Sequence, residues 1–250
     1  MGRALPACAA RPPLLTCRQQ NGDATSVMIV VHHLNNSRSQ RVLWLLEELD
    51  LPYEVKRYER DKGTMLAPPA LRAVHPLGKS PVISDGAATV AESGAIVEYL
   101  VEHHGEGRLR PPPGTAERLR YTYWLHYAEG SLMPPLLLGL VISRIPGPAV
   151  PWFARPIARG IAKGLRARFV APQIERHLDF LENELVDRDW FAGPDFSAAD
   201  VQMSFPLEAA AARAGLDARR PRLAAWLARI HARPAYQRAL ARGGPYELLR

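Results

Sequence analysis

Cysteine is nearly absent from this chain of 250 residues. The two that are present, Cys8 and Cys17, both lie near its start. Two cysteines cannot form a disulfide framework, and they are too few for a Cys-rich zinc site. Any thiol chemistry in the body of the chain must therefore use a thiol that a substrate brings.

Long apolar runs are also missing. The longest candidate extends from Leu136 to Ile145 and is interrupted by Gly139 and Ser143. A helix needs roughly 20 apolar residues to cross a bilayer. We therefore expect no transmembrane segment.

The first 27 residues lack any apolar period. They contain Pro6, Pro12 and Pro13, and Arg11 with the two prolines interrupts the apolar stretch that a secretory signal would need. Their Arg-rich, acid-poor composition has a faint similarity to a transit peptide. We favour a disordered N-terminal extension over residues 1–27, or a start codon assigned too early, with Met28 as the natural first residue.

Basic residues outnumber acidic ones, 32 Lys and Arg against 25 Asp and Glu, for a net charge of +7. This excess favours anionic partners, although a coding bias toward arginine explains it equally well. The arginines are scattered and no nucleic-acid recognition motif is present, so we expect no nucleic-acid partner. The segment from Trp152 to Val170 is basic and amphipathic, a pattern found on membrane surfaces. We favour a solvated helix face here and expect no membrane-surface contact.

The pattern of apolar residues predicts an α/β domain followed by an all-helical one. A buried strand is expected over 28–34, an amphipathic helix carrying Val42 to Leu49, and a short strand near 53–58 followed by a polar loop. Asp85-Gly86 predicts a hairpin, and Ser93 begins a further helix. A linker over 106–113 contains three consecutive prolines. The predicted domains are therefore residues 28–105 and 114–250.

Ser37 stands at the first junction from strand to helix. With Gln40 it has the spacing of a capping box, which explains both residues structurally. The same geometry also favours an anion, because a helix start has free N–H groups and a partial positive charge. A hydroxyl at that place can donate to a thiolate, whose formation helix N-termini promote.

Two further motifs follow along the chain. Lys79-Ser80-Pro81 opens a strand, where a cis Ser80–Pro81 bond would turn the backbone of Ser80 toward a peptide-like ligand and Lys79 could hold a carboxylate. Glu92-Ser93 precedes a helix, with Ser93 as the expected N-cap and a possible anion-binding hydroxyl. Each motif alone also fits a purely structural role.

In this order, the segments SRSQRVLWLLEEL, HPLGKSPVI and AESGAIVEYL, with the linker and helices that follow, resemble the cytosolic glutathione S-transferases. The segments LNNSRSQRVLWLLEEL and EGSL-x-PPL are most similar to the serine-type fungal and bacterial subgroup typified by the yeast enzymes. The resemblance implies a thioredoxin-like N-terminal domain, an all-α C-terminal domain, a homodimer and a cytoplasmic detoxification enzyme.

By this resemblance Ser37 activates the thiol, and the glutathione-binding residues are Lys79, Ser80, Glu92 and Ser93. Glutathione is then a cosubstrate, and no cofactor or metal is implied. The flanking Asn36, Arg38 and Ser39 are alternatives to Ser37. Arg41 matches the arginine of the family's first helix, and Ser197 with Asp200 matches its folding motif.

The first helix after the linker carries Tyr123, Trp124 and Tyr127, which in the family would line the pocket for a hydrophobic electrophile. We therefore expect conjugation of glutathione to such an electrophile. A non-catalytic binding or scaffold protein of the same fold is an alternative, as is a glutathione-dependent peroxidase or isomerase. The sequence does not name the electrophile.

Overall fold

The structure is a computed structural model and describes residues 28–61, 63–64, 66–216, 219–246 and 248. The predicted extension over residues 1–27 lies outside them. The N-terminal half contains β1 (Ile29–Leu34), α1 (Ser39–Glu48), β2 (Tyr53–Tyr58), α2 (Pro69–Val74), β3 (Val82–Asp85), β4 (Ala88–Ala91) and α3 (Ser93–His104).

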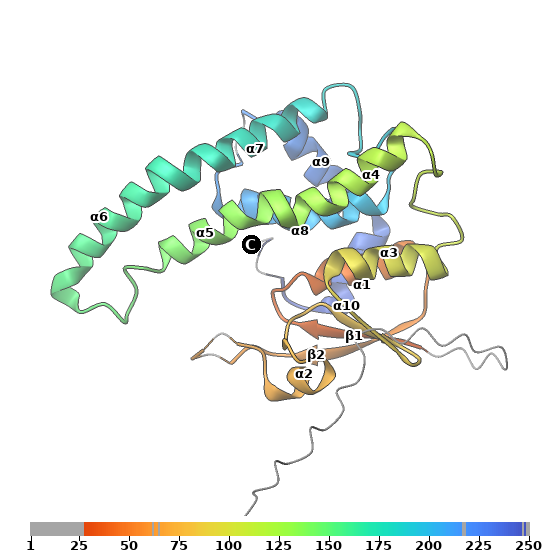
Figure 1. Ribbon diagram of the computed structural model, residues 1–250, viewed down its shortest axis with the longest axis horizontal. Coiled ribbons are helices and arrows are strands. Elements are labelled where there is room, and N and C mark those ends of the chain that lie inside the picture. The colour runs from red at the N-terminus through yellow and green to blue at the C-terminus, as the bar shows by residue number, and fades with distance from the viewer. Residues whose placement is uncertain (1–27, 62, 65, 217–218, 247, 249–250) are drawn as a thin grey trace, which may run out of the picture.

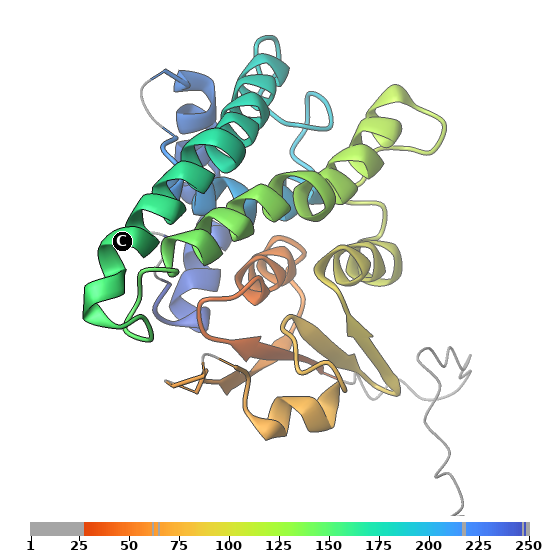
Figure 2. The same cartoon turned by 60° about the vertical axis from the view of Figure 1, so that its left-hand side comes forward.

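These strands form one mixed sheet in the order β2-β1-β3-β4. β1 and β2 are parallel, whereas β3 is antiparallel to both β1 and β4. Helices α1 and α3 cover the face of the sheet toward the second domain, and α2 lies on the opposite side (Figures 1 and 2). The predicted hairpin is confirmed, with Gly86 at a positive φ of 56° in its turn. The loop expected after β2 is interrupted by the six residues of α2.

The C-terminal half is helical, as predicted. It comprises α4 (Ala116–Tyr127), η1 (Ala128–Leu132), α5 (Met133–Ser143), η2 (Trp152–Ala154), α6 (Arg155–Leu165), η3 (Arg166–Val170), α7 (Ala171–Glu184), α8 (Ala198–Arg213), α9 (Pro221–His231) and α10 (Pro234–Gly243). Helix α8 is buried along most of its length, so it forms the centre of this domain.

The continuous helical run Ala116–Ser143 is long and apolar enough, by length and composition alone, to cross a membrane. Half of the apolar window in this run is buried inside the structure. Tyr121 and Trp124 are almost fully buried, and α4 packs against α8. This packing is that of a core helix in a globular domain.

A capping box forms at the start of α8, between the Ser197 and Asp200 that match the family's folding motif. Asp200 accepts hydrogen bonds from the backbone N–H of Phe191 and of Ser197, both at 3.0 Å, and from the Trp226 indole at 3.3 Å. The Ser197 hydroxyl also donates to it. Burial nevertheless raises the pKa of Asp200 to about 6 against the effect of these donors.

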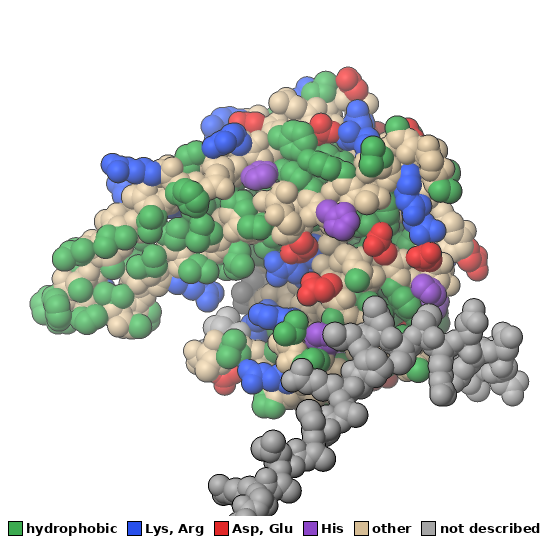
Figure 3. All heavy atoms as spheres, viewed as in Figure 1, with side chains coloured by type: hydrophobic (Ala, Val, Ile, Leu, Met, Phe, Trp, Pro, Cys, Tyr) green, Lys and Arg blue, Asp and Glu red, His purple; other side chains and the backbone are tan. Residues whose placement is uncertain are grey.

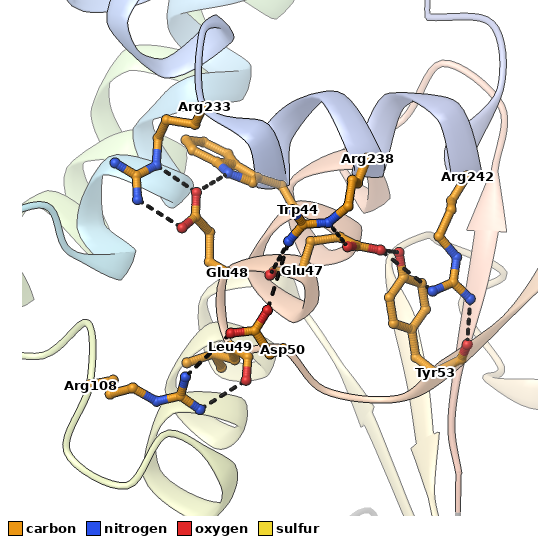
Figure 4. Close-up of polar contacts among 10 residues, drawn as sticks. All are labelled: Trp44, Glu47, Glu48, Leu49, Asp50, Tyr53, Arg108, Arg233, Arg238 and Arg242. Atoms are coloured by element: carbon orange, nitrogen blue, oxygen red, sulfur yellow. Dashed lines mark hydrogen bonds and ion pairs between the residues drawn. The ribbon is translucent and has the colours of Figure 1, made fainter.

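Arginines of the helical domain hold the end of α1 (Figure 4). Arg233 forms two hydrogen bonds with Glu48, which also accepts from the Trp44 indole. Arg238 donates to Glu47 at 2.7 Å, and Arg242 donates to the Tyr53 carbonyl at 2.7 Å. These contacts fix α10 against α1, and therefore fix the start of α1 relative to the helical domain.

Candidate functional site

The three sequence motifs meet at one end of the sheet. Because β3 is antiparallel to β1 and to β4, Val82 lies opposite both His32 and Ala91. The residues before β3 therefore lie beside those that follow β1 and β4. The Ser37 loop, the Lys79-Ser80 pair and the Glu92-Ser93 pair come together in this way.

Ser37 lies just before α1 and is 4% exposed. Its Oγ is 2.7 Å from Ser39 Oγ and 3.3 Å from Ser80 Oγ, and it accepts a hydrogen bond from the Ser39 backbone N–H. The predicted capping box with Gln40 does not form. Arg38 is the N-cap residue of α1 and makes no side-chain cap, because the Ser37 side chain turns back toward Ser39 and Ser80 instead.

A buried histidine that the sequence analysis did not select stands behind this pair. His33 Nδ1 is 2.9 Å from Ser39 Oγ, and the ring lies next to the Gly243 backbone. Burial and the charge of Arg57 lower the pKa of His33 to about 4. The ring is therefore neutral at pH 7. The neutral ring carries one proton, and its tautomer decides whether Nδ1 accepts from the Ser39 hydroxyl or donates to it.

Ser80 borders Ser37 from the second motif. Its hydroxyl donates to the His32 carbonyl at 2.9 Å and accepts from the Leu34 N–H at 3.3 Å. The expected cis peptide bond between Ser80 and Pro81 is present. Lys79 is exposed beside it, so its ammonium group is accessible to a ligand carboxylate.

The third motif differs in one detail from the prediction. Glu92, not Ser93, is the N-cap residue of α3, and it has a positive φ of 69°. Ser93 is buried, and its hydroxyl accepts from Arg41 at 2.7 Å and from the Gln202 amide at 3.3 Å. Glu92 itself is exposed at the surface of the site. A left-handed backbone is costly for a residue with a side chain, and such positions concentrate at functional sites.

Arg41 connects the site to the helical domain. Its guanidinium donates to the Gln202 carbonyl at 2.6 Å, to Ser93 and to Glu129. Arg38 also binds Glu129, with both carboxylate oxygens at 2.9 Å. Burial alone would raise the pKa of Glu129, but the charges of Arg41 and Arg38 outweigh it and the pKa lies below its usual value. Glu129 is thus a partly exposed counter-charge for the buried Arg41 that the sequence analysis missed.

A cavity of about 550 Å³ opens next to the start of α1. Asn36 and Arg38 border it on one side, and apolar residues of α5 and α8, including Leu136, Leu137 and Phe205, border it on the other. Ser37 lies directly behind this edge. In the described part of the chain, no three His, Cys, Asp or Glu residues are grouped so as to hold a metal ion.

The aromatic residues predicted to line the electrophile pocket do not border this cavity. Trp124 is 1% exposed and packs against Phe191, and the Tyr127 hydroxyl is 2.6 Å from His177 Nδ1. Tyr123 is half exposed on the outside of α4. None of the three lines the cavity beside Ser37. The α4 face that carries them turns toward α7, and the helical run reaches the cavity one or two turns later, from Met133 onward.

Comparison with known proteins agrees with this architecture. The family model described as "Glutathione S-transferase, N-terminal domain" matches residues 26–102, and the one described as "Glutathione S-transferase, C-terminal domain" matches residues 147–229. Glutathione S-transferase 3 of Schizosaccharomyces pombe is 42% identical over 73% of this chain and 74% of its own. Glutathione S-transferase 1 of Saccharomyces cerevisiae is 32% identical over 84% of this chain and 92% of its own.

Solved structures show the same relationship. A glutathione S-transferase from Actinobacillus pleuropneumoniae superposes with a TM-score of 0.74 at 33% identity, covering 89% of this chain and 96% of that one. A sphingomonad glutathione S-transferase complexed with glutathione superposes with a TM-score of 0.66 at 25% identity, covering 86% and 98%. The chain therefore belongs to the glutathione S-transferase family.

Proposed function

We propose that this protein binds glutathione at the end of the sheet and ionises its thiol, whose proton passes to solvent. The thiolate sulfur then forms a bond to a carbon of a hydrophobic electrophile, which either releases its leaving group as an anion or, if unsaturated, takes up a proton from solvent. The observation that carries the proposal is the position of the Ser37 hydroxyl between the start of α1 and the Ser80 segment. The sphingomonad relative complexed with glutathione has the same fold. Glutathione is then a cosubstrate, and the reaction needs no resident cofactor.

Four residues would hold the tripeptide at three places. The backbone of Ser80 pairs with its central peptide, and Lys79 binds the carboxylate of its glycine end. Glu92 and Ser93 bind the amino and carboxylate groups of its γ-glutamyl end. Because Ser93 already accepts from Arg41 and Gln202, its own hydroxyl proton is available for that carboxylate.

Ser37 then stabilises the thiolate. In the proposed state Nδ1 of His33 accepts the Ser39 proton, so Ser37 can turn its O–H from Ser39 or Ser80 toward the sulfur. The partial positive charge at the start of α1 acts on the same atom. A decrease of two units in the thiol pKa corresponds to about 2.7 kcal/mol in favour of the anion. The Ser39 geometry supports Ser37 over Ser39 as the activating residue, and Arg38 is engaged by Glu129.

The electrophile occupies the cavity beside Asn36 and Arg38. Its walls from α5 and α8 are apolar except at Ser143 and Arg213, which suits a hydrophobic molecule, and its near edge adjoins Ser37. Holding both reactants at this edge lowers the barrier by orientation. We propose this cavity, in place of the Tyr123 to Tyr127 face, as the electrophile site.

We also propose that the protein is a cytoplasmic homodimer. Leu119 and Tyr123 are 74% and 47% exposed, one turn apart on α4. This uncovered apolar strip would be buried by a second copy. Light scattering coupled to size exclusion measures the mass directly, and a monomer at micromolar concentration would contradict this part of the proposal.

The decisive experiment titrates the thiol of bound glutathione by ultraviolet absorbance of the thiolate, in the wild type, in Ser37→Ala and in the matched control Ser84→Ala. We expect a pKa below the free value of about 8.5 in the wild type and the control, and a return toward that value in Ser37→Ala. Conjugating activity should fall at least tenfold in Ser37→Ala, or about 1.4 kcal/mol. If the thiol pKa in the wild type equals that of free glutathione, the conjugation proposal is wrong and the non-catalytic scaffold alternative is favoured. Thiolate formation with activity toward peroxides or isomerisable substrates alone would favour the other enzymatic alternatives.

A further inference from the structure

Helices α5 and α6 form an arm that projects away from both domains (Figures 1 and 2). We define the arm as residues 137–169, which include the turn between the two helices. It contributes its base to the cavity, but its outer part has no role in the proposed conjugation.

Large apolar side chains of α6 point outward. Ile157, Ile161 and Leu165 follow one another at four-residue steps and are 69%, 55% and 44% exposed. The less exposed positions of the same helix are small, with Ala158 half-buried and Ala162 buried. A helix that only completed a globular core would bury its isoleucines and expose its small residues. This helix does the reverse.

The same apolar surface continues beyond α6. Trp152 and Phe153, in the short helix η2 at the tip, are 79% and 68% exposed, and Val141 of α5 is 55% exposed. Figure 3 shows hydrophobic side chains covering the viewed face of the arm from its tip to its base. Exposed apolar surface of this extent on a folded protein marks a site of interaction.

The charge of the arm is of one sign. The sequence from residue 130 to residue 174 contains no Asp or Glu, and it contains six basic residues, Arg144, Arg155, Arg159, Lys163, Arg166 and Arg168. In the described part of the chain, none of the six forms an ion pair with a carboxylate. The arginines of α9 and α10, such as Arg233 and Arg238, are by contrast paired with glutamates. The cationic charge of the arm is therefore available to an anionic partner.

We propose that the arm docks on the surface of an anionic phospholipid bilayer. A basic amphipathic helix with exposed aromatic and aliphatic residues lies in the plane of such an interface, with its apolar face among the acyl chains and its cations near the headgroups. The sequence alone favoured a solvated helix face. A solvated helix face does not explain why Trp152, Phe153 and Ile157 are exposed.

A second copy of the chain is the competing occupant of this surface. Two arms packed against each other would bring twelve basic residues together with no carboxylate from residues 130–174 of either copy to neutralise them. Like charges at that density oppose association. An anionic lipid surface covers the apolar face and also neutralises the charge, and this complementarity decides between the two.

The test is cosedimentation of the full-length protein with vesicles of phosphatidylcholine alone and of phosphatidylcholine with one third phosphatidylserine. We expect at least tenfold stronger binding to the anionic vesicles, and weakening by salt. Phe153→Ser with Ile157→Ser should lower that binding at least tenfold, as should Arg159→Glu with Lys163→Glu. Leu66→Ser with Val186→Ser, and Lys56→Glu with Arg188→Glu, are controls that change equal numbers of exposed residues outside the arm.

Circular dichroism of each variant shows whether it folds, and all four pairs lie on exposed positions. Equal binding to both vesicle types, or equal losses in arm and control variants, would overturn the proposal. So would concentration-dependent self-association that Phe153→Ser with Ile157→Ser abolishes in the absence of lipid, because the second copy would then be the occupant. These results are independent of thiol ionisation, so the docking proposal and the proposed conjugation stand or fall separately.

Discussion

The Oγ atoms of Ser37 and Ser80 lie 3.3 Å apart, although the two residues come from different segments of the N-terminal domain. Ser80 also holds the His32 carbonyl and the Leu34 N–H with its hydroxyl. The side chain of Ser80 thus supports the loop that presents Ser37. In the proposed complex its backbone, and not its hydroxyl, meets glutathione.

Ser80→Ala should therefore separate stability from catalysis. Loss of the hydroxyl leaves two partly buried backbone groups without their partner, so the free energy of unfolding should fall by about 1–2 kcal/mol. The kcat/KM for conjugation should change by less than about threefold, because the backbone contact remains. Urea denaturation and steady-state kinetics measure the two quantities. A loss of kcat as large as that of Ser37→Ala would mean that Ser80 itself contacts the sulfur.

Filling the cavity should affect one substrate and not the other. Leu137 borders the cavity and is half exposed, so Leu137→Trp reduces its volume without disturbing the buried core. We expect the KM for the electrophile to rise about fivefold or more, with the KM for glutathione unchanged. Tyr123→Ala is the matched control on the face first predicted to hold the electrophile. An effect of Tyr123→Ala in place of Leu137→Trp would restore that prediction.

The sequence was sufficient to predict local structure wherever turn and cap residues specify the geometry. The β-hairpin, the helix after Glu92 and the capping box at Ser197 follow from turn and cap chemistry within a few residues. Antiparallel pairing of β3 then brings Ser37 and Ser80 together, so motif order alone predicts their proximity. The capping box predicted for the start of α1 was wrong. The Ser37 hydroxyl contacts Ser80, a partner that spacing along the sequence does not reveal.

Contacts between the domains were beyond local reasoning. Glu129 meets Arg38 and Arg41 only after α4 and η1 have packed on α1, and a lone glutamate in a helix carries no signal of this. The place of His33 in the site could not be predicted, because it depends on its position next to both Ser39 and the Gly243 backbone. The aromatic residues of α4 fit a substrate pocket and a core equally well by spacing, and burial of Trp124 decides for the core.

Removal of the Glu129 charge should lower the free energy of unfolding, because the buried guanidinium of Arg41 then lacks a counter-charge. Glu129→Gln keeps the size of the side chain but leaves the guanidinium of Arg41, whose side chain is 1% exposed, without its counter-charge. We expect a loss of about 2–4 kcal/mol in the free energy of unfolding. Asp50→Asn, which alters an exposed pair with Arg238 at 3.8 Å, should cost less than about 1 kcal/mol. Equal losses in the two variants would show that burial does not govern these pairs.

His33 predicts a loss of stability in acid. The pKa of His33 is about 4 in the folded protein and 6.5 in the unfolded chain. Between these two pH values the unfolded chain therefore binds more protons. The contribution of His33 is therefore complete above pH 6.5 and is lost as the pH falls toward 4, by about 3 kcal/mol. His33→Asn should flatten this part of the stability curve measured by urea denaturation. An unchanged slope would mean that the ring is already protonated in the folded state.

The contribution of Asp200 to stability changes with pH in the opposite direction to that of His33, over part of the same pH range. Its pKa of about 6 exceeds the ordinary value of 3.8, so the folded protein binds more protons between the two. Its contribution is complete below pH 3.8 and is lost as the pH rises through 6, by about 3 kcal/mol.

Asp200→Asn keeps one acceptor but places an amide against the Ser197 N–H, so it should destabilise the protein at pH 7 by about 1–3 kcal/mol. It should also steepen the net acid loss between pH 4 and 6, since the opposing term of Asp200 is gone while that of His33 remains. A shallower acid slope in Asp200→Asn would show that the donors around the carboxylate outweigh its burial.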